Sequence, residues 1–262
     1  FEGQDLTRMT KRQLAAVRPD IQMIFQDPFS SLDPRMRVFD IIAEPLRVHK
    51  AARGQELTDR VMGLMKVVGL DASYASRFPH EFSGGQRQRI GIARALALRP
   101  KLIICDEPVS ALDVSIQAQI LNLLYDLQKQ FNLTYIFIAH GLPTVKHVSS
   151  KVAVMYLGKV MELADKDELF ERPMHPYTQG LFEAVPIPDP TLPPEEGRRE
   201  FLQGDIPNAM NPPSGCYFHP RCPYATEECR KTAPQFRPCA PGSTHYVACH
   251  HPLENGQGIV RG

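Results

Sequence analysis

Hydrophobic and polar residues follow two different periods along the chain, and together they predict an α/β protein. Apolar residues recur at the spacing of one helix face in three segments, which are 57–68, 90–97 and 116–127. Short apolar runs of the kind that form strands occupy 21–25, 102–105 and 134–139. The last two runs lack polar alternation, so we expect strands that are buried on both faces of a sheet.

The second half of the chain changes character along its length. Residues 152–163 have the pattern of a β-hairpin, a short helix follows at 167–171, and an apolar helical stretch occupies 181–185. Five prolines between 186 and 194 then indicate a linker. The predicted domains are a main domain at 1–185, its helical subdomain at about 36–98 and a cysteine-rich extension at 186–262.

A phosphate-binding feature stands at the start of the helix that follows residue 83. Ser83 can cap this helix, and Gly84, Gly85 and Gln86 form its first turn. The unpaired backbone N–H groups of that turn and the positive end of the helix converge on one point. Such a point suits a phosphate group.

Polar residues follow the three predicted strands. Gln26 follows the first strand, Asp106 and Glu107 close the second, and His140 follows the third. Two acids at the carboxyl end of a strand suit Mg²⁺ and an attacking water. The imidazole of His140 could bridge a phosphate and the glutamate through hydrogen bonds.

The order of these parts resembles the nucleotide-binding subunit of an ATP-binding-cassette (ABC) transporter, over essentially all 262 residues. The segment 83–86 matches the family signature, the strand ending at Asp106 matches its Walker B motif, and Gln26 matches its Q-loop. His140 matches the switch histidine, although Gly141 stands where the family usually has aspartate. The resemblance implies an α/β fold with a P-loop NTPase-like core, a helical subdomain and a small C-terminal extension.

The resemblance also implies a role for each matched residue. Asp106 would hold Mg²⁺ through water, and Glu107 would polarise the attacking water. Gln26 would sense the metal, and His140 would hold the γ-phosphate. The signature would act on the ATP of a partner subunit, because the family forms a head-to-tail dimer around two ATP molecules. The loop that would cross to the partner consists of Ser110, Ala111, Leu112 and Asp113.

The run His-Pro-Tyr-Thr at 175–178 narrows the resemblance to the second ATPase subunit of oligopeptide and dipeptide importers. The implied partners are a second ABC ATPase subunit, transmembrane permease subunits and, indirectly, an extracytoplasmic substrate-binding protein, with no nucleic acid. The implied location is the cytoplasmic face of the cell membrane, as a peripheral protein. The cargo stays open among oligopeptides, dipeptides, glutathione and nickel, because other subunits select it.

One family motif does not occur, since no Gly-x-x-x-x-Gly-Lys-Ser/Thr is found in the 262 residues. That motif, Walker A, supplies the backbone cradle and the lysine that hold the β- and γ-phosphates. We therefore expect an ABC core that is incomplete at its N-terminus and inactive by itself. Two alternatives stay open, namely a non-catalytic fragment or regulatory pseudo-ATPase, and a soluble ABC protein of DNA repair or translation.

Composition adds two exclusions. Thirty Lys and Arg against 29 Asp and Glu give a net charge of +1, so charge predicts neither a nucleic-acid nor a membrane-surface partner. No apolar stretch approaches the roughly 20 residues of a transmembrane helix, and residues 1–5 show no signal-peptide pattern. We expect a cytosolic protein whose link to the membrane is specific.

Five of the six cysteines lie between 216 and 249, and in a cytosolic chain such clustering favours a metal over disulfides. The spacing of Cys216, Cys222, Cys229 and Cys249 is uneven and differs from that of a zinc finger. An iron–sulfur cluster can bind thiolates that are spaced so irregularly along the chain. Some ATPases of the resembled subfamily carry a [4Fe–4S] cluster at matching cysteines. A cluster, a zinc ion and unliganded thiols stay open as alternatives, and Cys239 is left spare.

Overall fold

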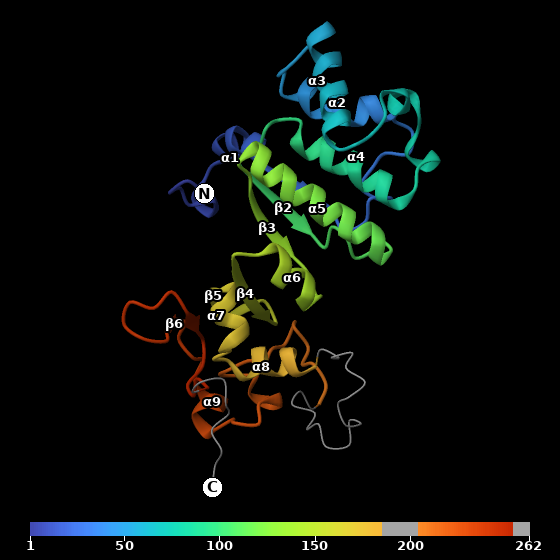
Figure 1. Cartoon of the computed structure of the whole chain (residues 1–262). Coiled ribbons are helices and arrows are strands. Elements are labelled where there is room, and N and C mark those ends of the chain that lie inside the picture. Colours follow the sequence, from blue (N-terminus) through green and yellow to red (C-terminus); the bar gives the residue numbers. More distant parts are fainter. Residues whose placement is uncertain (185–203, 254–262) are drawn as a thin grey trace. The chain divides into compact units, whose positions relative to one another are not determined.

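The computed structural model describes residues 1–184 and 204–253 of the chain (Figure 1). The chain forms two compact units, which comprise residues 1–140 and 141–262. The predicted boundary after residue 185 and the proline-rich linker lie outside the described residues. The domain division of the sequence analysis therefore stays a prediction.

The first unit contains a parallel sheet of three strands, as the apolar runs predict. Its strands are β1 (Ile21–Ile24), β2 (Leu102–Asp106) and β3 (Thr134–Ile138), in the order β1-β2-β3. The middle strand β2 pairs in parallel with both neighbours, and Ile24 aligns with Cys105 while Asp106 aligns with Ile138. All three carboxyl ends therefore reach the same edge of the sheet.

The expectation that the strands are buried on both faces is wrong for β3, and β2 is fully buried on one face only, since Leu102 and Ile104 on its other face are half-buried. Ile103 and Cys105 of β2 are fully buried, whereas Ile136 and Ile138 of β3 are 50% and 46% exposed. Because side chains of a strand alternate between the two faces, one face packs against helices, and the other is left partly open by the described residues of this unit. Burial raises the pKa of the Cys105 thiol to about 12, so this cysteine is an inert part of the core.

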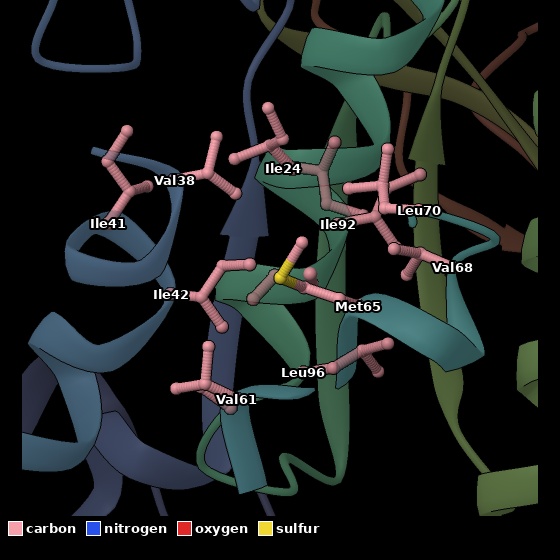
Figure 2. Packing of buried hydrophobic residues seen from close by; sticks show 14 of the residues in the cluster. Ile24, Val38, Ile41, Ile42, Val61, Met65, Val68, Leu70, Ile92 and Leu96 are labelled. Atoms are coloured by element: carbon pink, nitrogen blue, oxygen red, sulfur yellow. The ribbon is translucent and has the colours of Figure 1, made fainter. Parts of the chain in front are cut away.

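Helices cover the packed face of the sheet and form the predicted helical subdomain. The helices α4 (Gly84–Leu96) and α5 (Val114–Phe131) contribute to the same core as β1 and β2. The helices α2 (Val38–Val48) and α3 (Gly54–Val67) pack with α4. Figure 2 shows side chains of this core, and its labelled residues are Ile24, Val38, Ile41, Ile42, Val61, Met65, Val68, Leu70, Ile92 and Leu96.

Short elements connect these parts of the first unit. The helix α1 (Lys11–Val17) begins with a capping box between Thr10 and Gln13. The helix α5 ends at its C-terminal cap, Asn132, whose φ of 53° is the left-handed conformation typical of such caps. The short 3-10 helices of this unit are η1 (Leu6–Arg8), η2 (Arg18–Asp20), η3 (Ala72–Ser76) and η4 (Pro79–Glu81).

The second unit is built on the predicted hairpin. The strands β4 (Lys151–Tyr156) and β5 (Lys159–Asp165) are antiparallel, and both turn residues, Leu157 and Gly158, have positive φ values of 45° and 76°. Such a turn matches the twist of the two strands. The short strands β7 (Tyr246–Val247) and β6 (Arg237–Pro238) extend the sheet in the order β4-β5-β7-β6. The cysteine-rich segment is thereby paired with the hairpin, which the sequence pattern does not predict.

The remaining helices of the second unit are short. They are α6 (Leu142–Val148), α7 (Lys166–Glu171), α8 (Pro176–Glu183), η5 (His219–Arg221) and α9 (Glu227–Lys231). The predicted helix at 167–171 is confirmed as α7, while the apolar stretch at 181–185 begins its helix five residues earlier than predicted, at Pro176. None of the helices in the described ranges is long and apolar enough to cross a membrane.

Candidate nucleotide site and cysteine cavity

Three of the predicted site residues meet at the carboxyl edge of the parallel sheet. The side chain of Gln26 donates a hydrogen bond from Nε2 to Oε2 of Glu107 at 2.9 Å. The ring nitrogen Nδ1 of His140 lies 3.3 Å from the same carboxylate oxygen. Each residue follows a different strand, so the parallel register brings them together. The convergence that the motifs imply is present in the structure.

The backbone at Glu107 is strained in a way that directs its side chain. Its φ of 42° lies in the left-handed region, which residues with a Cβ rarely adopt. Two hydrogen bonds hold this conformation, because the Glu107 N–H donates to the carbonyl of Ile138 at 3.0 Å and the hydroxyl of Ser110 donates to the Glu107 carbonyl at 3.1 Å. The carboxylate is 26% exposed and can reach a ligand.

Asp106 directly precedes Glu107 and is the last residue of β2. It is half-buried, and it stands opposite Ile138 of β3. Carboxylate oxygens are the ligands that Mg²⁺ prefers. The chemistry of the predicted Mg²⁺ ligand and its place at the strand end fit the metal.

The signature segment forms the predicted helix start. Ser83 Oγ accepts the backbone N–H of Gln86 at 3.3 Å, and Gln86 Oε1 accepts the N–H of Ser83 at 3.1 Å. This capping box engages both polar side chains. The backbone N–H groups of Gly84 and Gly85 belong to the first turn, where helical N–H groups have no partner within the helix.

The two glycines of the signature also have a packing role that sequence reasoning missed. A Cβ at Gly85 would lie 2.5 Å from Cγ2 of Ile116 in α5, and a Cβ at Gly84 would lie 3.2 Å from Leu112. Leu112 belongs to the predicted partner loop 110–113, whose last residue, Asp113, stands just before α5. The helix start and this loop are therefore in close contact within one chain.

The arginines after the signature make hydrogen bonds within their own unit. They are half-buried, and each donates to a backbone carbonyl of the same unit. Arg87 donates to Phe82 at 2.7 Å and Arg89 to Val68 at 2.6 Å. Arg94 donates to Ser31 at 2.7 Å, which links α4 to the loop after Gln26. The long side chains make these internal contacts because the loops leave carbonyl groups without helix or sheet partners.

A cavity in the second unit is lined by the four cysteines that the sequence analysis groups together. Its lining contains Cys216, Cys222, Cys229 and Cys249, together with His175, Phe218 and other residues. Cys239 does not line it and belongs to a separate pocket beside His245. The four thiols are near enough that burial and their neighbours raise the pKa values of Cys222 and Cys249 to about 12.

Backbone N–H groups surround these sulfur atoms. The N–H of His251 donates to Sγ of Cys249 at 3.3 Å, two residues along the chain. The backbone of Phe218 acts in the same way on Cys216 and that of Tyr224 on Cys222, and each lowers the thiol pKa against the effect of burial. Within the ranges 1–184 and 204–253, however, no three His, Cys, Asp or Glu side chains stand ready to hold a metal ion.

His175 is the buried histidine of the His-Pro-Tyr-Thr run. Its Nδ1 accepts the N–H of Tyr177 at 2.9 Å, which caps α8, and only 1% of the residue is exposed. Burial lowers the pKa of His175 to about 4, against the opposing influences of Glu162 and the Ala248 carbonyl. Its Nε2 is buried, and no acceptor reaches the distance and angle of a hydrogen bond to it; the Ala248 carbonyl is near enough to raise the pKa without reaching that geometry.

A second histidine of this unit is fully paired, and no sequence signal points to it. His245 Nε2 lies 2.6 Å from Glu162, and its Nδ1 lies 3.3 Å from Glu168. Burial alone would lower the pKa of His245, but the hydrogen bond and charge of Glu162, with Glu168, raise it. Glu162 is itself fully buried and also accepts the N–H groups of Met174 and His175. Glu162 of β5 is therefore hydrogen-bonded both to the segment at 174–175 and to His245.

Two protein families match the chain. The family described as "ABC transporter" matches residues 1–110, and the family described as "Oligopeptide/dipeptide transporter, C-terminal region" matches residues 161–229. The first match contains Gln26, the signature and Glu107. The second contains the His-Pro-Tyr-Thr run and three of the four cysteines that line the cavity.

Full-length relatives extend these matches. The chain is 53% identical to the oligopeptide transport ATP-binding protein AppF of Bacillus subtilis, with 95% of this chain and 75% of AppF covered. It is 56% identical to OppF of Escherichia coli, an oligopeptide transport ATP-binding protein, with 94% and 73% covered. The chain belongs to this family of ABC transporter ATP-binding proteins. Its relative DppF of Pseudomonas aeruginosa, a di/tripeptide transport ATP-binding protein, is 49% identical over 95% of this chain and 75% of its own.

Solved structures agree with the family. The ABC protein cbiO1 of Clostridium perfringens is 28% identical with a TM-score of 0.56, and 62% of this chain and 63% of cbiO1 are covered. The ATP-binding cassette MJ0796, solved as a dimer with ADP and Pi, is 27% identical with a TM-score of 0.55, over 63% and 72% of the two chains. The predicted fold class, an α/β ABC ATPase fold with a helical subdomain and a C-terminal extension, is confirmed.

Proposed function

We propose that this chain is the ATP-binding and ATP-hydrolysing subunit that powers the import of oligopeptides or dipeptides across a cell membrane. The observation that carries the proposal is the convergence of Gln26 and His140 on one oxygen of Glu107. The names of the 49–56% identical relatives support peptide transport as the work that this site drives.

The proposed chemistry uses each side chain at that edge. Phosphoryl transfer to water needs positioning and charge neutralisation more than covalent catalysis. The Glu107 carboxylate accepts a hydrogen bond from the Gln26 amide. The same carboxylate can accept a hydrogen bond from the attacking water, orient it and take its proton. His140 is 75% exposed, which leaves its ring free to contact a γ-phosphate. Asp106 would hold Mg²⁺, and the ion would neutralise phosphate charge.

We further propose the assembly in which this site works. The signature at 83–86 would complete the ATP site of a second ABC ATPase subunit, and the loop 110–113 would cross to that partner. Transmembrane permease subunits would hold the pair at the cytoplasmic face of the membrane, and an extracytoplasmic binding protein would deliver the peptide. The dimer of the similar cassette MJ0796 supports such a pairing.

Residues 1–262 contain no Walker A motif, and we propose that a polypeptide limited to these residues does not hydrolyse ATP. Nothing in it would supply the lysine that grips the β- and γ-phosphates. Its signature helix is complete, so it could still serve a partner's site. A non-catalytic regulatory role is the alternative for the subunit that contains these residues, and the strained, hydrogen-bonded Glu107 favours the catalytic role for that subunit.

Uptake by the assembled transporter tests this proposal. Proteoliposomes that contain all subunits should accumulate a labelled oligopeptide only with ATP, and Ser83→Arg should abolish the uptake because the arginine occupies the phosphate-facing helix start. Ser150→Arg is the matched control, since Ser150 is an exposed serine outside the motifs. Unchanged uptake with Ser83→Arg would contradict the signature's role.

We also propose that Cys216, Cys222, Cys229 and Cys249 bind a [4Fe–4S] cluster. The four line one cavity, and backbone N–H groups face three of the sulfur atoms, where they can donate to cluster-bound thiolates and offset part of the effect of burial. A cluster with four iron atoms holds its thiolates farther apart than a single ion does. A cluster site therefore does not require the cysteine side chains to converge on the position of one ion, and in the described residues they do not.

Chemical analysis separates the cluster from zinc and from free thiols. Anaerobically purified protein should be brown and contain iron and sulfide at about four per chain. Cys222→Ser should remove the colour, and Cys239→Ser should not, because Cys239 does not line the cavity. Colourless protein with one zinc ion per chain would exclude the cluster, and metal-free protein would leave only reduced thiols.

A further inference from the structure

The cysteine cavity contains one side chain whose hydrogen bonding is incomplete. His175 lines the cavity with the four cysteines and is 1% exposed. Its Nε2 has no hydrogen-bond partner in the protein. Buried polar groups almost always have a partner, so an unpaired one that lines a cavity indicates a missing acceptor.

The protonation of the ring follows from its other nitrogen. A backbone N–H can only donate, and the N–H of Tyr177 points at Nδ1 at 2.9 Å, so Nδ1 must be the acceptor. A neutral imidazole carries its single proton on the remaining nitrogen. Nε2 is therefore an N–H donor, and the Tyr177 backbone fixes this state. Pro176 and Tyr177 begin α8, so the order of the run sets the position of the donor.

The other three histidines of the cavity wall are only half-buried, and none of their ring nitrogens is both buried and unpaired. His250 has both ring nitrogens engaged, Nε2 with the Thr232 carbonyl at 2.9 Å and Nδ1 with Glu228 at 3.3 Å. His251 Nε2 bonds to Thr226 at 3.0 Å, and His219 Nδ1 bonds to the Cys216 carbonyl at 2.9 Å. Of the four, His175 is the most buried and has a donor left over.

We propose that His175 is a positioning residue of the iron–sulfur site, whose Nε2–H donates a hydrogen bond to a sulfur atom bound in the cavity. This inference rests on the cluster assigned above. Four of the residues that line the cavity are cysteines, whereas Ala248 does not line it and its carbonyl does not reach hydrogen-bond geometry with Nε2. Hydrogen bonds to cluster sulfurs stabilise the more negative, reduced state and so raise the reduction potential.

Two variants separate the donor from the helix cap. In His175→Asn the amide oxygen can replace Nδ1 as the acceptor for Tyr177, but no group reaches the place of Nε2. In His175→Gln the longer side chain can place an amide N–H near that position. We expect the Asn variant to have a lower reduction potential and faster loss of iron in air, and the Gln variant to recover the wild-type potential at least in part.

His250→Asn is the matched control, because His250 lines the same cavity and both of its ring nitrogens already have partners outside it. Its potential should stay close to that of the wild type. Equal potentials in the wild type and His175→Asn would overturn the role of His175 while leaving the cluster intact. A Gln variant that shifts as far as the Asn variant would also overturn it, because lost packing would then be the cause.

A measurement on the wild type keeps the inference testable if a variant fails to fold. With ¹⁵N-labelled histidine, the reduced cluster of the wild-type protein should show a hyperfine coupling to an imidazole nitrogen, and the coupling should be lost in His175→Gln. Absence of this coupling in a protein that contains the cluster would overturn the role of His175. Protein without iron and sulfide would overturn the cluster itself and this role with it.

Discussion

One histidine–glutamate pair from each unit can be compared, and the surroundings of the two pairs are opposite. At the sheet edge of the first unit, His140 is 75% exposed and lies 3.3 Å from Glu107. In the second unit, His245 is 2% exposed, lies 2.6 Å from Glu162 and has a second carboxylate on its other nitrogen. The first pair is open to a ligand, whereas the second is closed by the fold.

This difference separates a reacting group from a structural one. An exposed ring can move between a glutamate and a phosphate at little cost, since an exposed pair contributes only about 0–1 kcal/mol. A buried pair cannot open without leaving charges unpaired in a medium that solvates them poorly. The residue types alone therefore do not predict function, and burial decides between the two roles.

The largest contrast is expected in stability. Glu162→Ala removes the acceptor of two backbone N–H groups and of His245, so the free energy of unfolding should fall by about 3–5 kcal/mol. Glu107→Ala should change it by about 1 kcal/mol or less. Urea unfolding followed by circular dichroism measures both. Equal losses in the two variants would show that the pairs do not differ as described.

The pH dependence of stability gives a second contrast. Glu162 and Glu168 raise the folded pKa of His245 above the unfolded value of about 6.5, so the folded protein binds the proton more tightly. Its stabilising contribution is fully present below about pH 6.5 and is lost as pH rises through the folded pKa. His245→Gln should remove this decline, and His140→Gln should not. Thermal unfolding between pH 6 and 9 would record it, and a decline that persists in His245→Gln would have another origin.

The smallest effect is expected for the exposed pair itself. A double-mutant cycle with Glu107→Gln and His140→Ala should give a coupling energy for folding of about 0.2–1 kcal/mol. The same cycle with Glu162→Gln and His245→Ala should give a clearly larger coupling. Coupling of several kcal/mol between His140 and Glu107 would mean that the sheet edge is a rigid structural network.

The sequence predicts that Gln26 and Glu107 meet and misses the pair of Glu162 and His245, although the two contacts span nearly the same sequence separation. Gln26 and Glu107 are 81 residues apart, and Glu162 and His245 are 83 apart. The first contact is predictable because each residue directly follows a strand of one parallel sheet. The second depends on β7 joining the edge of β5, and a two-residue strand leaves no periodicity to read.

Packing details were similarly out of reach. Hydrophobic pattern identifies the strand at 134–139, but it does not say which of its faces the unit covers, and so the burial of Ile136 and Ile138 was predicted wrongly. The signature predicts the helix cap at Ser83, whereas the close approach of Gly85 to Ile116 depends on the position of α5. Local chemistry and the meeting of residues at the ends of parallel strands are readable from the sequence, whereas the packing of one element on another is not.

The most direct test of the central claim is ATP turnover by the assembled transporter that contains Glu107→Gln. The amide keeps the size of the side chain but is a far weaker proton acceptor, so ATP binding should persist while hydrolysis falls at least about 100-fold, the scale of losing a general base. Single-turnover hydrolysis and equilibrium ATP binding, measured on the same preparation, separate the two effects. Hydrolysis within a few-fold of the wild type would contradict the assignment of Glu107 and of the site built around it.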